Sequence, residues 1–101
     1  MENMEEYVHY NNLYDCYQTL LTEKQRIYFE EYYFNNLSLS EISENYNVSR
    51  NAAYKQIQIT IKKLIEYEEK LKLNEKRIKI EKLIEKEEDN NTKKSLEELL
   101  S

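Results

Sequence analysis

The chain has 101 residues, enough for one domain with a modest core and too few for two independent domains. Its single cysteine excludes an internal disulfide, and its net charge of -5 argues against strong electrostatic binding to a polyanion. Because Gly and Pro are absent while Glu, Lys, Leu and Ile are abundant, the composition predicts an all-helical protein. The sequence has neither a signal peptide nor an apolar run of membrane-spanning length, so we expect a cytoplasmic protein without membrane contact.

The residue pattern offers little to catalysis or to metal binding. His9 is the only histidine, and it has no second His or Cys at ligand spacing. Cys16 lies between Leu13 and Tyr17 in a helical stretch, so we interpret it as a small core hydrophobe and not as a nucleophile. The sequence contains no Gly-rich phosphate loop and no evident pair of nucleophile and base. We therefore expect no enzyme activity, no metal and no cofactor.

The first predicted helix covers Met4 to Leu20. Apolar residues recur there at intervals of three and four, which makes one side of a helix apolar. They are Tyr7, Tyr10, Leu13, Tyr14, Tyr17 and, just beyond the helix, Leu21. The ten tyrosines of the chain could form a base-stacking surface, but codon bias and core packing explain them equally well.

A second helix should run from Glu23 to about Asn35. Thr22 and Gln25 have the spacing of a capping box, which marks a helix start. Its apolar stripe consists of Ile27, Phe29, Tyr32, Tyr33 and Phe34. With no glycine in the chain, turns fall to asparagine, which tolerates a left-handed backbone better than most residues. The expected turns lie at Asn35-Asn36, Asn47 and Asn90-Asn91.

The segment from Leu37 to Tyr54 predicts a helix-turn-helix. Ser38 and Glu41 form a second capping box, so a short third helix should start near Leu39 or Ser40 and end at Tyr46. Asn47 then takes the turn.

Ser49 follows as the cap of a fourth helix, which should run from Arg50 to about Leu71. Val48 should fill the angle between the third and fourth helices. Two helices that cross steeply need small residues at the crossing, and Ser43 should face Ala52 and Ala53 there.

Helical geometry divides the fourth helix into two faces, at about 100° per residue. One face should pack on the core, and it carries Ala53, Ile57, Thr60, Ile61 and Leu64. The other face is free of acidic residues and has the side chains that suit base edges in a recognition helix. We predict that it binds nucleic acid through Arg50, Asn51, Tyr54, Lys55, Gln58 and Lys62.

Two observations favour a different interpretation of that face. Any solvent-facing helix carries Lys, Gln and Asn, and the chain as a whole is acidic although phosphate neutralisation supplies most non-specific DNA affinity. The charge is uneven, because residues 1–21 contain acidic residues and no Lys or Arg. Weak or partner-assisted binding is compatible with this distribution.

Residues 74–101 form a C-terminal helical extension to a domain of residues 1–73. The extension mixes Glu and Lys with sparse apolar residues and cannot build a core alone. Its stripe consists of Leu73, Ile80, Leu83 and Ile84, followed by a break at Asp89-Asn90-Asn91 and a last turn starting at Thr92 with Leu96, Leu99 and Leu100. It could fold back, pair with another copy or fray; we expect a packed, partly mobile extension that contributes to a homodimer. Ile59 lies opposite the expected core, so it favours either a partner or a contact with another helix of the same chain.

Residues 13–71 resemble the YlxM family, small bacterial helix-turn-helix proteins usually encoded beside the GTPase of the signal recognition particle. Ser43 and Ala53 depart from the usual pattern, in which Ala and Val respectively are common. The resemblance rests on Leu13-Tyr14-Asp15-Cys16-Tyr17, Leu20-Leu21-Thr22-Glu23-Lys24-Gln25-Arg26, Tyr32-Tyr33, Leu39-Ser40-Glu41-Ile42, Tyr46-Asn47-Val48-Ser49-Arg50, Tyr54 and Tyr67-Glu68-Glu69-Lys70-Leu71.

The resemblance implies a fold similar to the promoter-reading carboxy-terminal domain of sigma factors, and a regulatory role or a role in the signal recognition particle pathway. The sequence leaves three alternative functions open. The first is a DNA-binding regulator, the second is an accessory protein that contacts the RNA or the GTPase of the signal recognition particle, and the third is a helical module for protein interaction alone.

Overall fold

The computed structural model describes residues 3–86 and 90–100, and within these ranges it is helical and contains no strand. This confirms the predicted all-helical class. The elements are α1 (Met4–Tyr17), the 3-10 helix η1 (Gln18–Leu20), α2 (Glu23–Tyr33), α3 (Leu39–Tyr46), α4 (Arg50–Leu71), α5 (Leu73–Lys86) and α6 (Asn90–Glu98).

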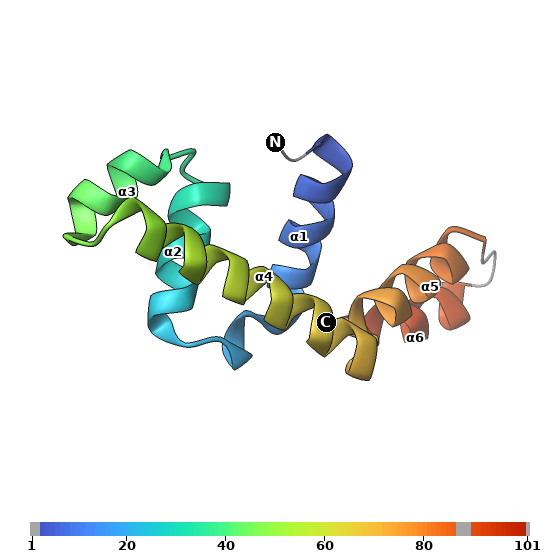
Figure 1. The fold of residues 1–101 in the computed structure, drawn as a ribbon. Coiled ribbons are helices and arrows are strands. Elements are labelled where there is room, and N and C mark those ends of the chain that lie inside the picture. The colour runs from blue at the N-terminus through green and yellow to red at the C-terminus, as the bar shows by residue number, and fades with distance from the viewer. Residues whose placement is uncertain (1–2, 87–89, 101) are drawn as a thin grey trace.

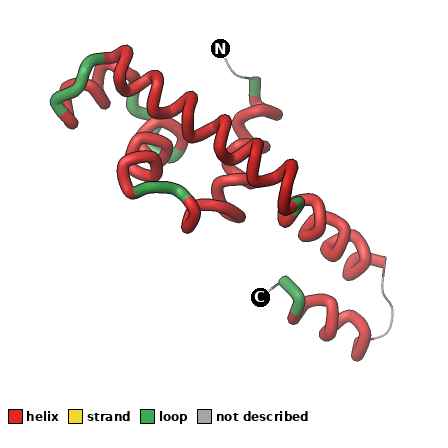
Figure 2. The backbone as a smooth tube through the Cα atoms, turned by 60° about the horizontal axis from the view of Figure 1, so that its bottom comes forward, coloured by secondary structure: helices red, strands yellow, loops and turns green. Residues whose placement is uncertain are grey.

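The long helix α4 organises the fold. It contacts α1, α2 and α3 along its length, with Tyr17 of α1 bonded to Glu68 near its C-terminal end, whereas α5 and α6 pair with each other beyond that end (Figure 1). The resulting molecule is elongated, with principal extents of 55 × 23 × 19 Å. Figure 2 shows α6 folded back beside α5, so that these two helices form an arm beside the four-helix domain. The division into residues 1–73 and 74–101 stays a prediction.

Aromatic rings fill much of the core between α1 and α2. The Phe29 ring stacks between Tyr14 and Tyr33, with centroids 4.6 and 4.5 Å away. The Tyr7 hydroxyl donates a hydrogen bond to the Tyr33 carbonyl at the edge of this cluster. The rest of the hydrophobic core comes from the other helices and from the segment before α2, and it consists of Leu13, Tyr17, Leu21, Tyr28, Ile42, Ala53, Ile57, Ile61 and Leu64. Core packing therefore accounts for several of the tyrosines, as one of the two interpretations expected.

The boundaries of α1 and α2 differ slightly from the predicted ones. The α-helix α1 ends at Tyr17 and tightens into η1, three residues before the predicted end. The capping box of Thr22 and Gln25 is present, but α2 ends at Tyr33. Phe34 is therefore the cap residue of α2. It is 45% exposed but its ring still packs edge-on against Tyr14 and Phe29, whereas Tyr28, which the predicted stripe omitted, is buried.

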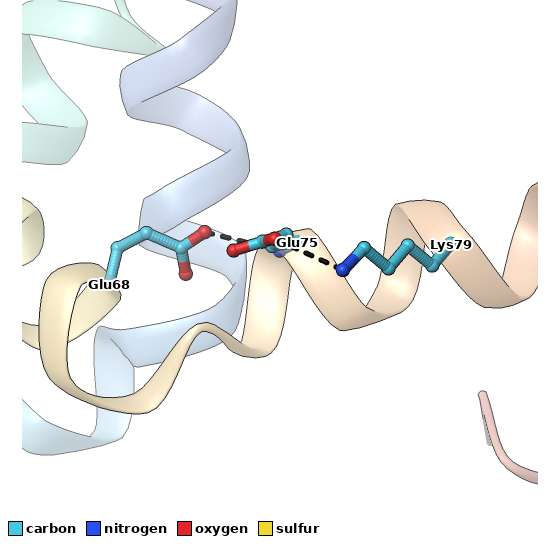
Figure 3. A network of polar contacts seen from close by, with 3 residues as sticks. All are labelled: Glu68, Glu75 and Lys79. Atoms are coloured by element: carbon cyan, nitrogen blue, oxygen red, sulfur yellow. Dashed lines mark hydrogen bonds and ion pairs between the residues drawn. The ribbon is translucent and has the colours of Figure 1, made fainter.

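The turn between α4 and α5 was not predicted. Lys72 takes a left-handed conformation there, with φ at 54°. The Glu68 carboxylate accepts hydrogen bonds from the Tyr17 hydroxyl at 2.6 Å and from the Asn74 and Glu75 amides at 3.1 Å each. These amides belong to the first turn of α5, which has no intrahelical partners for them. Figure 3 shows the hydrogen bond from the Glu75 amide to the Glu68 carboxylate. It also shows the ion pair between the Glu75 carboxylate and Lys79 at 3.2 Å.

The structure also differs from the sequence prediction near residue 90, where a turn was expected. Helix α6 already begins at Asn90, so Asn90 and Asn91 belong to its first turn and the helix starts two residues before Thr92. Asp89 lies outside the described residues. Asn36 and Asn47 do take left-handed conformations, with φ at 56° and 53°, which confirms asparagine as the turn residue at those two positions.

Candidate nucleic-acid interface

Local hydrogen bonds set the start and end of the helix-turn-helix. Ser38 and Glu41 form the predicted capping box at the start of α3. Asn47 ends α3 in a left-handed conformation, as predicted. The Ser49 hydroxyl then accepts a hydrogen bond from the Ala52 amide at 3.0 Å and begins α4. Three short-range caps therefore place the N-terminus of α4 directly after the turn.

The two helices pack through small and aliphatic side chains. Ile42 of α3 and Ala53 of α4 are fully buried, and Ile57 is 2% exposed. Ser43 is partly buried and its hydroxyl donates to the Ser40 carbonyl at 2.8 Å, which removes the polar group from the contact. Ala52 is exposed, so the prediction that it lines the crossing with Ala53 was wrong. Its position one residue earlier turns it about 100° away from the packed side.

The predicted binding face of α4 is exposed along its length. Its exposed residues are Arg50, Asn51, Tyr54, Lys55, Gln58 and Lys62. Among the residues that the structure describes, none of these six side chains is hydrogen-bonded or ion-paired. The five residues predicted for the opposite face are all buried, Thr60 among them, whose hydroxyl donates to the Gln56 carbonyl. The 3.6-residue period therefore sorted α4 into its two faces correctly.

Charge along α4 changes sign beyond its first four turns. Residues 50–65 contain two further lysines besides Arg50 and Lys55 and no acidic residue, whereas Glu66, Glu68 and Glu69 follow. Glu44 is exposed on the neighbouring α3. A ligand with regular negative charge would therefore meet attraction on the N-terminal half of α4 and repulsion beyond residue 65.

An aromatic contact that the sequence did not reveal positions α3. The Tyr46 ring packs edge-on against Tyr28 with centroids 5.4 Å apart, and its hydroxyl donates to the Glu31 carboxylate at 3.1 Å. Burial, followed by this hydrogen bond, raises the pKa of Tyr46. The contact joins residues 15 to 18 positions apart, so no local pattern could have indicated it. It fixes the end of α3 on α2, directly before the turn into α4.

The structure brings no further ligand or catalytic partner to the residue types that metal or nucleophilic chemistry would need, within the residues that it describes. In the described part of the chain, no three His, Cys, Asp or Glu side chains gather as a metal site would require. Cys16 is partly buried, and burial raises the pKa of its thiol, which disfavours the nucleophilic thiolate. Across residues 3–86 and 90–100, none of the helices has the length and apolar character needed to cross a membrane.

A short capped helix, a left-handed turn and a second helix with a free outer face define a helix-turn-helix protein. The comparisons agree with this class. Residues 4–101 match the model of the family described as "Putative helix-turn-helix protein, YlxM / p13 like", and the chain belongs to this family. The description is that of a helix-turn-helix family and not of an enzyme family.

Curated relatives are similar to this chain over 65–96% of its length. A UPF0122 protein of Fusobacterium nucleatum is 40% identical over 97 residues, which cover 96% of this chain and 94% of the relative. A UPF0122 protein of Shouchella clausii is 54% identical over 66 residues, 65% of this chain and 61% of the relative. One of Bacillus cereus is 50% identical over 76 residues, 75% of this chain and 69% of the relative.

Proposed function

We propose that this chain is a regulatory protein that binds duplex DNA by placing the N-terminal half of α4 in the major groove. The observation that carries the proposal is the outer face of residues 50–65, which is exposed, acid-free and directly preceded by the turn. In helix-turn-helix proteins the N-terminal residues of the second helix reach the base edges. The chain acts by binding and not by catalysis.

The side chains of this face divide between two roles. The Arg50 guanidinium can donate two hydrogen bonds to a guanine edge, and the Asn51 and Gln58 amides have the donor and acceptor that pair with an adenine edge. Lys55 also reaches the bases, and Tyr54, 49% exposed, supplies a ring for apolar contact. Lys62 lies farther from the helix start and binds a backbone phosphate.

The acidic total limits how strongly this face can bind. Duplex DNA contributes a log-log salt slope of about -0.9 for each phosphate neutralised. With Lys62 alone on a phosphate the slope is about -0.9, and it steepens to about -2.7 if Arg50 and Lys55 also neutralise phosphates next to the bases that they contact; both values are at the shallow end for DNA-binding proteins. Glu66 and Glu69 repel the backbone beyond that point and confine the contact to the first turns.

The direct test is a titration of labelled duplex DNA at two salt concentrations. The double variant Arg50→Ala/Lys55→Ala should weaken binding by about 2–4 kcal/mol, because each specific or charge-assisted contact contributes about 1–3 kcal/mol. Its melting temperature should stay close to that of the parent, since both side chains are at the surface. The matched control Lys70→Ala/Lys94→Ala removes two exposed lysines elsewhere and should bind like the parent.

The same titration separates the rival ligands. The RNA of the signal recognition particle replaces DNA in one arm, and the GTPase of the particle is added in another. If the RNA binds more tightly than the DNA and the Arg50→Ala/Lys55→Ala variant loses this binding, then the ligand of the α4 face is the RNA of the particle and not DNA. Binding of the GTPase alone, unaffected by that variant, would replace nucleic-acid binding with protein interaction.

A further inference from the structure

The outer face of α1 is acidic and carries exposed apolar side chains. At about 100° per residue, Met4, Glu5, Val8 and Asp15 fall within an arc of about 100°. All four are exposed, Met4 by 75% and Val8 by 48%. Residues 1–21 contain no Lys or Arg that could neutralise the two carboxylates. We call these four residues the α1 outer face.

The outer face of α5 has the opposite charge. Lys76, Lys79, Lys82, Leu83 and Lys86 fall within an arc of about 120°, and Leu83 is 54% exposed. The one acidic residue in this arc is Glu75, whose carboxylate is ion-paired with Lys79 (Figure 3). The other carboxylates of α5 lie on the far side of the helix. We call these five residues the α5 outer face.

Neither face finds its complement within one chain. Helix α5 leaves the domain near the C-terminal end of α1 and runs away from it in both views (Figures 1 and 2). In the described part of the chain, no hydrogen bond or ion pair is made by the side chains of Glu5, Asp15, Lys82 and Lys86. The two helices nevertheless match in length, since each has 14 residues and is therefore about 21 Å long.

We propose that the chain forms a two-fold symmetric dimer in which the α5 outer face of each copy binds the α1 outer face of the other. The symmetry makes this contact twice, which doubles the buried apolar area and the number of charge pairs. Leu83 then packs against Met4 and Val8 while the lysines face the carboxylates. The inference is independent of nucleic-acid binding by α4.

Charge reversal tests the pairing directly. The arm variant Lys82→Glu/Lys86→Glu and the α1 variant Glu5→Lys/Asp15→Lys should each be monomeric by light scattering, because like charges then face each other. Both variants should keep the helical circular-dichroism spectrum of the parent, since all four side chains are exposed in one chain. An equimolar mixture of the two variants should form a heterodimer, in which both contacts again join opposite charges.

A chain that carries all four substitutions should dimerise like the parent, because both contacts again join opposite charges. This result would show that neither pair of substitutions abolishes dimerisation by preventing folding. The matched control Glu23→Lys/Glu44→Lys reverses two exposed carboxylates of α2 and α3 and should remain dimeric. A monomeric parent would overturn the proposal. So would a dimer lost only in the arm variant, which would mean that arm pairs with arm, or a mixture of variants that fails to recombine.

Discussion

The hydrogen bond between Tyr17 and Glu68 should hold the arm on the domain. The Tyr17 hydroxyl donates to Glu68 at 2.6 Å and accepts from the Leu73 amide at 3.0 Å. The Glu68 carboxylate also accepts from the amides of Asn74 and Glu75. Two side chains therefore satisfy three free amides at the start of α5, and Asn74 is buried enough that water cannot easily replace them.

The magnitudes follow from these contacts. Tyr17→Phe removes one charge-assisted and one neutral hydrogen bond, and the cost is about 2.5–4 kcal/mol because such bonds contribute about 1.5–3 and about 1 kcal/mol. Glu68→Ala removes three bonds to a carboxylate and should cost more than Tyr17→Phe, because it also leaves the Asn74 and Glu75 amides without their acceptor. The double variant should lose less than the sum, with a coupling energy of about 1.5–3 kcal/mol for the shared bond.

Urea unfolding at one fixed protein concentration, followed by circular dichroism, measures the stabilities of the parent, the two single variants and the double variant. The concentration is fixed because the proposed dimer would make stability depend on it. Tyr54→Phe and Glu69→Ala serve as matched controls because both side chains are exposed and neither is hydrogen-bonded to the residues that join α4 and α5. They should each change stability by less than about 0.5 kcal/mol. A coupling energy near zero for Tyr17 and Glu68 would refute the reasoning.

Three further predictions concern the core, the turn and alkaline pH. Ile42→Ala should lower the free energy of unfolding by about 2–5 kcal/mol, because Ile42 is fully buried; a melting temperature within a degree or two of the parent would contradict this. Asn47→Val should cost about 1–2 kcal/mol because a β-branched residue resists the left-handed turn, whereas Asn47→Gly should keep the parent's stability in the same urea assay. Burial, with the negative charge of Glu30, raises the pKa of Tyr14 to about 12, and burial with the Glu68 hydrogen bond does the same for Tyr17. Because the folded pKa of both tyrosines lies above the unfolded value of 10, their contribution to stability is full below pH 10 and is lost between pH 10 and about 12. A pH series of urea unfolding measures this loss. Constant stability across that window would contradict the raised pKa values.

Local signals made the helix-turn-helix predictable from the sequence. Capping boxes need only residues three positions apart, so Ser38 with Glu41 and Thr22 with Gln25 could be recognised without tertiary information. Asparagine at position 47 was the available left-handed residue between two helical patterns. The helical period then determined which side of α4 is buried.

Features that depend on distant residues were missed. The Tyr17 and Glu68 contact joins positions 51 apart, and the left-handed Lys72 beside it is not a typical turn residue. The end of α2 was placed two residues too late, and the buried Tyr28 was left out of its apolar stripe. The opposite charges of the α1 and α5 outer faces are visible in the sequence, but only the fold shows that both remain uncovered.

Amide chemical shifts recorded during a titration with duplex DNA show whether the N-terminal half of α4 meets nucleic acid. We expect shift changes that concentrate between Asn47 and Lys62 at low salt, fade as salt rises and are absent in Arg50→Ala/Lys55→Ala. Shift changes confined to α1 or to the arm, or none at low salt, would contradict the proposed binding by α4.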